Sequence, residues 1–129
     1  MKQYKVKKFV GEAEKLNVTD LSLSETLAHF LNIDPKGRQK NALGAGLYKL
    51  RIATNEGQGK SEGSRTLLAF KNESRIIWLH LFAKNDKENI TASDLKKLKL
   101  LANILLSMSD EEVVRLIKAN ELYEVNENV

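Results

Sequence analysis

The stretch GQGKSEGSR, residues 57–65, decides the fold because it separates two segments that both have the pattern of a β-strand. Before it, residues 47–53 alternate, with Lys49 and Arg51 on one side and apolar side chains on the other. After it, residues 66–70 form a second strand-like run. Glycine allows positive φ angles and the close approach of a ligand to the main chain. The stretch is therefore predicted to connect two strands, and its cations make it a place where a phosphate could bind.

Residues 75–83 have the strongest strand pattern in the chain, and their alternation predicts two different faces. One face would be apolar and lie under helices, and it consists of Ile77, Leu79, Leu81 and Ala83. The other face would consist of Ile76, Trp78, His80 and Phe82. On this second face, Trp78 and Phe82 either stack on bound bases or pack in the core. Three consecutive strands with short connections predict an antiparallel meander.

The N-terminal third is predicted to be mainly helical. Residues 3–7 alternate weakly and could form a short edge strand, and residues 9–16 have the spacing of a short helix. Ser22 or Ser24 can cap the next helix by accepting a hydrogen bond from a backbone N–H group that has no partner within the helix. Pro35 disfavours helical geometry at the preceding residue and so ends this helix.

The C-terminal part is also predicted to be helical. Thr91 or Ser93 can cap a helix that carries a regular apolar stripe. Ser109 followed by Glu112 has the spacing of a capping box, which predicts the start of a second helix. Together with the three central strands, these helices predict an α+β fold.

The composition and charge of the chain restrict its possible partners. Residues 36–65 carry seven cations and two acids, whereas residues 107–129 carry six acids and two cations. A basic centre suits a polyanion, although solvated surface charge is the simpler explanation. The chain has no cysteine, which excludes a disulfide framework and a thiolate metal site. No apolar run is long enough to span a membrane, and the lysine-rich start does not fit a signal peptide, so we expect a soluble cytoplasmic protein.

Several kinds of chemistry are excluded because their motifs are missing. His29 and His80 lie in different segments without a spaced carboxylate motif, which argues against a metal site. Gly59-Lys60-Ser61 lacks the upstream glycine of a Walker loop, and a strand rather than a helix follows it. Nucleotide hydrolysis and dinucleotide binding are therefore not expected, and no cofactor is predicted.

What remains is a cationic cluster on or beside three strands that we expect to be neighbours, made of Lys49, Arg51, Lys60, Arg65 and Lys84. Such a cluster could contact several phosphates, and arginine can hold a phosphate through two parallel N–H donors. Cleavage of RNA without a metal also needs a base and an acid, and a lysine can serve only if neighbouring cations or burial lower its pKa. Histidine is the other candidate near neutral pH, although His80 could instead be a packed strand residue.

Three blocks of the sequence resemble the RelE/HigB-like toxins of bacterial type II toxin–antitoxin systems, in the RelE/ParE superfamily. They are LGAGLYKLRIA (43–53), GQGKSEGSRT (57–66) and FAKNDKENI (82–90). Their order and spacing look like those of the family, and the likeness extends from about residue 9 to residue 125. The middle block is the specific part, because the helices alone would not identify the family.

The resemblance implies a single toxin domain over residues 1–129, with a core over about 9–107 and a C-terminal helical extension over about 108–125. It implies an antiparallel sheet of three to four strands with the N-terminal and C-terminal helices packed on one face. It also implies an mRNA interferase, a metal-independent endoribonuclease that cleaves messenger RNA on the ribosome and so inhibits translation. Carried over by position, the catalytic residues would be Lys49, Arg51, Arg65 and Lys84. The residues that would bind RNA or phosphate are Gly59, Lys60, Ser61, His80, Asn85 and Lys87.

The resemblance implies messenger RNA, the ribosome and a cognate antitoxin as partners, and no membrane. The antitoxin would often carry a helix-turn-helix, so operator DNA would be reached only through it. Two alternatives stay open, a non-enzymatic gyrase poison like the ParE toxins and a decayed toxin that only binds its antitoxin. The second arises because Glu62 and Ser64 stand where the family's loop commonly has glycine and tyrosine.

Overall fold

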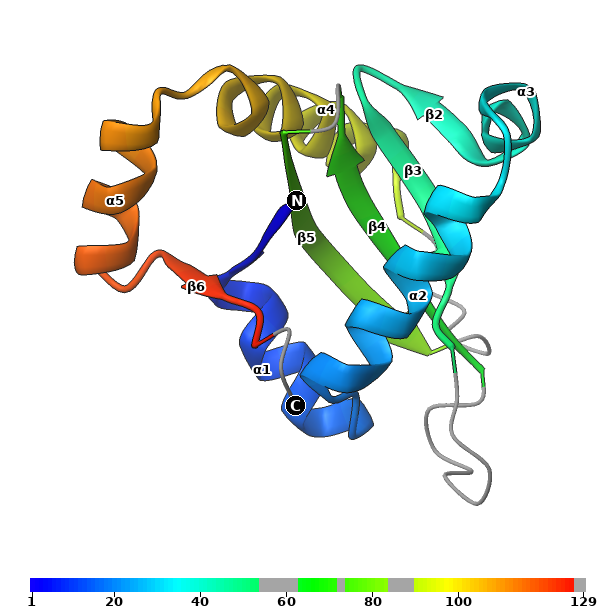
Figure 1. Cartoon of the computed structure of the whole chain (residues 1–129), viewed down its shortest axis with the longest axis horizontal. Helices are drawn as coiled ribbons and strands as arrows, with labels where there is room; N and C mark the ends of the chain where they lie inside the picture. Colours follow the sequence, from blue (N-terminus) through cyan, green and yellow to red (C-terminus); the bar gives the residue numbers. More distant parts are fainter. Residues whose placement is uncertain (54–62, 72–73, 84–89, 127–129) are drawn as a thin grey trace.

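The computed structural model describes residues 1–53, 63–71, 74–83 and 90–126, which form an α+β fold (Figure 1). The N-terminal half contains β1 (Lys2–Val6), α1 (Lys7–Leu16), α2 (Asp20–Asn32), α3 (Pro35–Arg38), a 3₁₀ turn (Gln39–Asn41), β2 (Ala42–Gly44) and β3 (Leu47–Arg51). The C-terminal half contains β4 (Ser64–Phe70), β5 (Arg75–Ala83), α4 (Ala92–Ser107), α5 (Asp110–Lys118) and β6 (Leu122–Glu124). The predicted meander of three strands is confirmed, because β3, β4 and β5 pair antiparallel in chain order.

The described strands form one mixed sheet of six strands in the order β2-β3-β4-β5-β1-β6. All neighbours are antiparallel except β1, which runs parallel to β5 with Tyr4 opposite Ile77. The prediction of a purely antiparallel sheet of three to four strands was therefore wrong in strand number and direction. The two edge strands β2 and β6 have three residues each, which is too short to produce a periodic pattern.

The first and last strands of the chain pair with each other at one edge of the sheet. β6 pairs antiparallel with β1, which places it at the edge of the sheet beside the N-terminal strand (Figure 1). Two backbone hydrogen bonds extend this pairing: the N–H of Lys7 donates to the carbonyl of Glu121 at 3.2 Å, and the N–H of Val125 donates to Gln3 at 3.0 Å. The C-terminal segment is thus part of the same sheet as the N-terminus.

Helices cover both faces of the sheet. On one face, α1 and α2 pack on the sheet through a core that includes Phe9, Phe30 and Trp78. On the other face, α4 and α5 pack through a core that includes Ile77 and Leu105. Figure 1 shows α2 in front of β3 and β4, and α4 behind them. The prediction that all helices lie on one face was wrong, since β4 and β5 bury residues on both sides and each side needs a cover.

A bulge in β5 changes which side chains share a face. Leu67 pairs with His80 and Leu68 pairs with Trp78, so the intervening residue of β5 has no partner of its own. As a result Leu81 joins Trp78 in the core under α1 and α2, while Phe82 packs against the core under α4. The prediction from strict alternation, with Leu81 beside Leu79 and with His80 and Phe82 beside Trp78, was wrong for this reason.

The helix caps agree with the sequence in most cases. Thr91 caps α4, and the capping box that begins at Ser109 is present at the start of α5. At α2 the cap is Thr19, whose hydroxyl accepts from the N–H of Ser22 at 3.1 Å, rather than Ser22 or Ser24. The helix therefore starts earlier than predicted, because threonine also favours this position.

Candidate functional site

Three of the predicted cations lie together at one end of the sheet. Lys49 and Arg51 of β3 alternate with Leu50, which packs in the core under α2, so the two cations point to the α4 side. Arg51 lies directly opposite Arg65 of β4, and Arg65 lies opposite Phe82 of β5. Lys49 and Arg51 are exposed and Arg65 is half-buried. The structure therefore gathers these three cations on one accessible face.

Arg51 and Arg65 face each other across the pairing of β3 with β4. Directly opposite residues in a sheet have Cβ atoms about 4.5–5.5 Å apart, and like charges in such pairs are destabilising. Among the described residues, no carboxylate forms an ion pair with Arg51 or Arg65. Nη1 of Arg65 donates to the carbonyls of Gly63 at 3.2 Å and Ser64 at 3.3 Å, which orients its guanidinium. An anion bound between the two arginines would relieve their repulsion.

Phe82 connects this cationic face to His80. The Nζ atom of Lys49 lies 5.7 Å from the centroid of the Phe82 ring, a cation–π distance. The His80 ring stacks on Phe82 with 5.3 Å between centroids and 23° between planes. The cationic face and His80 thus belong to one continuous surface.

Trp78 does not belong to this surface. It is fully buried, its ring lies 6.2 Å from that of Phe9, and its Nε1–H donates to Oε1 of Gln3 at 3.1 Å. Of the two possibilities that the sequence left open, Trp78 packs in the core, and a stacking role on RNA is wrong for it. A buried indole needs a partner for its N–H group, and Gln3 supplies one.

Not every cation of the basic centre is available to a ligand. Nε of Arg38 donates to the carbonyl of Ile33 at 2.9 Å, and Nη2 donates to that of Leu31 at 2.9 Å. Its guanidinium also lies 5.4 Å from the ring centroid of Phe30 and 5.6 Å from that of Phe70. Arg38 therefore satisfies the C-terminal carbonyls of α2 and has a structural role.

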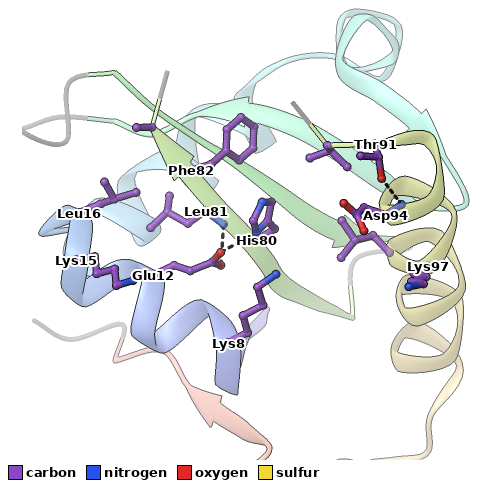
Figure 2. Close-up of a pocket in the computed structure, with 13 residues that line it drawn as sticks. Lys8, Glu12, Lys15, Leu16, His80, Leu81, Phe82, Thr91, Asp94 and Lys97 are labelled. Atoms are coloured by element: carbon purple, nitrogen blue, oxygen red, sulfur yellow. Dashed lines mark hydrogen bonds and ion pairs between the residues drawn. The ribbon is translucent and has the colours of Figure 1, made fainter. Parts of the chain in front are cut away.

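A groove of about 830 Å³ lies between α1 and α4 and continues from His80 and Phe82 (Figure 2). Its floor is the C-terminal part of β5, because β1 pairs with β5 only as far as Trp78 and leaves the later residues with an open edge. The described residues of its walls include five charged side chains, which are Lys8, Glu12, Lys15, Asp94 and Lys97. Three of these five are cations, which can attract the phosphates of a polyanion.

Glu12 fastens α1 to this open edge. Its Oε1 accepts a hydrogen bond from the N–H of Leu81 at 3.1 Å, and its Oε2 lies 2.8 Å from Nδ1 of His80 (Figure 2). The side chains of Glu12 and His80 are 18% and 19% exposed, so most of this contact is shielded from water. Sequence reasoning missed Glu12. Its only signal was a carboxylate next to the apolar stripe formed by Phe9 and Ala13.

The described residues contain neither a cluster of metal-ligating side chains nor a membrane-spanning helix. Within residues 1–53, 63–71, 74–83 and 90–126, no three histidine or acidic side chains cluster as metal ligands would. In the same part of the chain, no helix is both long and apolar enough to cross a bilayer.

A family model described as the RelE toxin of the RelE/RelB toxin–antitoxin system matches residues 1–125. The chain belongs to the RelE toxin family. Membership of the RelE family makes it the toxin component of a toxin–antitoxin system, with an antitoxin as its partner. No curated protein matches the chain.

Only some residues of the site predicted from the sequence lie within the described part of the chain. Lys49, Arg51, Arg65 and His80 are described, and they lie on one surface. The remaining predicted residues lie outside the described part of the chain, and they are Gly59, Lys60, Ser61, Lys84, Asn85 and Lys87.

Proposed function

We propose that this RelE-family toxin is a metal-independent endoribonuclease that cleaves messenger RNA during translation on the ribosome. The observation that supports the proposal is the placement of Lys49, Arg51 and Arg65 on one open face of the sheet, next to Phe82 and His80. Guanidinium groups can hold a phosphodiester and stabilise the negative charge that develops when a 2′-oxygen attacks phosphorus. A phosphate bound between the two arginines would offset the repulsion between their like charges.

The other predicted residues keep the roles that the resemblance to the family implies. We assign Lys84 to catalysis with the three described cations. Phosphate and RNA binding is assigned to His80, Gly59, Lys60, Ser61, Asn85 and Lys87. Ribosome dependence follows from the resemblance to RelE/HigB-like toxins, and the toxin would act in the cytoplasm, where messages are translated.

The proposal is tested by expressing the chain in bacteria without its antitoxin and mapping the 5′ ends of a message in translated and untranslated forms. We expect growth arrest and new ends in the translated form alone. Arg65→Gln should reduce cleavage by about 10²–10³-fold, the usual effect of removing one donor that stabilises a developing charge. Arg115→Gln is the matched control, because Arg115 is exposed on α5, away from the cationic face.

Two outcomes would contradict the nuclease proposal. Growth arrest with intact messages and broken DNA would identify a gyrase poison instead. A lack of any arrest would leave a protein that only binds its antitoxin.

We also propose that the antitoxin is a small helix-turn-helix protein encoded beside the toxin, through which the pair reaches operator DNA. Its co-expression should restore growth, and the two chains should purify together. Persistent arrest in the presence of this neighbour would rule it out as the antitoxin.

A further inference from the structure

We propose that Glu12 and His80 form a proton-transfer pair in the groove between α1 and α4. In this pair, Nε2 of His80 accepts the proton of the attacking 2′-hydroxyl of RNA, and Glu12 is the positioning residue. The inference rests on the proposed endoribonuclease function and adds to it the group that removes the proton.

The contact between Glu12 and His80 determines which nitrogen of the His80 ring carries the hydrogen. Oε2 of Glu12 lies 2.8 Å from Nδ1 of His80, and among the described residues the buried Nδ1 has this ion-pair contact but no hydrogen bond of good geometry. A carboxylate oxygen and a bare ring nitrogen would repel each other at this distance, so Nδ1 carries the hydrogen. The neutral ring then has its lone pair on Nε2, at the opposite edge. Since His80 lines the groove, Nε2 is the nitrogen left for a ligand there.

The carboxylate is itself held in place. Oε1 of Glu12 accepts from the N–H of Leu81 at 3.1 Å, so one side chain binds both the backbone of β5 and the ring that precedes it. The other side of the arrangement is the stack of His80 on Phe82, at 5.3 Å between centroids. The ring is thus restrained by two contacts, which is the preorganisation that general base catalysis requires.

The surroundings of the ring suit an RNA strand. Phe82 lies opposite Arg65 and under Lys49, so His80 is close to the place where a phosphate would be held. Figure 2 shows Lys8 extending from α1 toward His80, with Lys97 across the groove on α4. A strand whose phosphate sits on the cationic face could therefore continue along the groove.

The proposed step needs no group beyond RNA and water. Nε2 takes the proton from the 2′-hydroxyl while the 2′-oxygen forms a bond to the adjacent phosphorus. The bond between phosphorus and the 5′-oxygen breaks, and the leaving oxygen takes a proton from water. The hydroxide that remains takes the proton from the imidazolium ring. The products are a 2′,3′-cyclic phosphate and a 5′-hydroxyl end.

The experiment measures single-turnover cleavage of a short message on purified ribosomes, with the full chain. His80→Gly should slow cleavage by about 10²–10⁴-fold, and free imidazole should restore a large part of the rate. Imidazole should not restore Arg65→Gln, because that variant lacks a phosphate contact rather than a base. Glu12→Gln can keep one oxygen for Leu81 but lacks the charge that orients the ring, so it should slow cleavage by roughly tenfold.

A second variant and the melting temperature separate this role from a purely structural one. His80→Gln keeps a polar side chain of similar size that cannot transfer the proton, and it should be as slow as His80→Gly at an unchanged melting temperature. If the wild-type chain cleaves but these variants cleave at the wild-type rate, or imidazole has no effect on His80→Gly, the pair is overturned while the nuclease function stands. If the wild-type chain does not cleave, the proposed nuclease function is wrong, and the proton-transfer pair that rests on it is wrong as well.

Discussion

Trp78 and Phe82 both lie on β5, but the bulge between them directs their rings to opposite faces of the sheet. Trp78 is fully buried and hydrogen-bonded to Gln3, whereas Phe82 is partly exposed between Lys49 and His80. At the scale of single residues, one aromatic ring therefore serves the fold and the other lies in the candidate site.

Substitutions at these two positions should have different effects. Trp78→Ala should lower the free energy of unfolding by about 3–5 kcal/mol, because it leaves a cavity and removes the donor to Oε1 of Gln3. Phe82→Leu should change it by less than about 1.5 kcal/mol but should reduce RNA cleavage. Urea unfolding and the ribosomal cleavage assay measure the two effects. An equal loss of stability in both variants would contradict the assignment.

Tyr4 should make stability depend on alkaline pH. Burial, and secondarily the carboxylate of Glu124, raises the pKa of the Tyr4 hydroxyl above its usual value of 10.0. The unfolded chain therefore loses this proton at a lower pH than the folded chain. The contribution is complete below about pH 10 and is lost as the pH rises through the folded-state pKa. Tyr4→Phe should show a smaller fall in the free energy of unfolding between about pH 9 and pH 11, and an unchanged slope would disprove the effect.

At the scale of elements, Arg75 joins the start of β5 to the junction of α4 and α5. Its Nη1 donates to the carbonyls of Leu105 at 2.9 Å and Met108 at 2.8 Å, and its Nη2 lies 3.0 Å from Oδ1 of Asp110. The last carbonyls of a helix have no donor within the helix. One buried guanidinium therefore completes the end of α4 and holds the junction against the sheet.

Arg75→Met should lower the free energy of unfolding by about 3 kcal/mol, since each buried carbonyl left without a donor costs about 1–3 kcal/mol. Asp110→Asn is the matched control. Its side chain is fully exposed, so the loss of this ion pair should change stability by less than about 1 kcal/mol. Denaturant unfolding of both variants provides the comparison, and similar losses would show that the ion pair, rather than the carbonyl contacts, holds the junction.

The elements predicted correctly from the sequence are those with enough residues to show a period. The strands β3, β4 and β5 and the helices α4 and α5 are of this kind. The parallel pairing of β1 with β5 could not be predicted, because it depends on contacts between distant residues. For the same reason, only part of the candidate site could be predicted from the sequence. Alternation alone placed Lys49 and Arg51 on one side of a strand, whereas the contact of Glu12 with His80 exists only after α1 has packed against the open edge of β5.

At the scale of the whole molecule, β6 and the residue that follows it contribute to both cores. Leu122 packs in the core under α4 and α5, and Val125 packs in the core under α1 and α2. The short segment between them is also the second hydrogen-bonded neighbour of β1. The C-terminal strand therefore links parts of the molecule that the central strands keep apart.

Leu122→Ala should consequently lower the free energy of unfolding by about 2–5 kcal/mol, as expected for a buried leucine. Leu100→Ala is the control, because Leu100 is 58% exposed on α4 and its loss should change stability by no more than about 0.5 kcal/mol. Urea unfolding of both variants measures the difference. A small effect at Leu122 would show that the sheet is stable without its last strand.

The pairing of β1 also determines when the toxin can become complete during its own synthesis. A growing chain has an N-terminal strand without either of its partners until Arg75–Trp78 have been made, and it lacks the outer partner until residues 122–124 leave the exit tunnel. The two flanking backbone hydrogen bonds, Lys7 to Glu121 and Val125 to Gln3, can likewise form only after this last segment has been made. The complete sheet therefore forms only after residues 122–124 are available, whereas β3, β4 and β5 already have all the residues of their mutual pairing once Ala83 has been made.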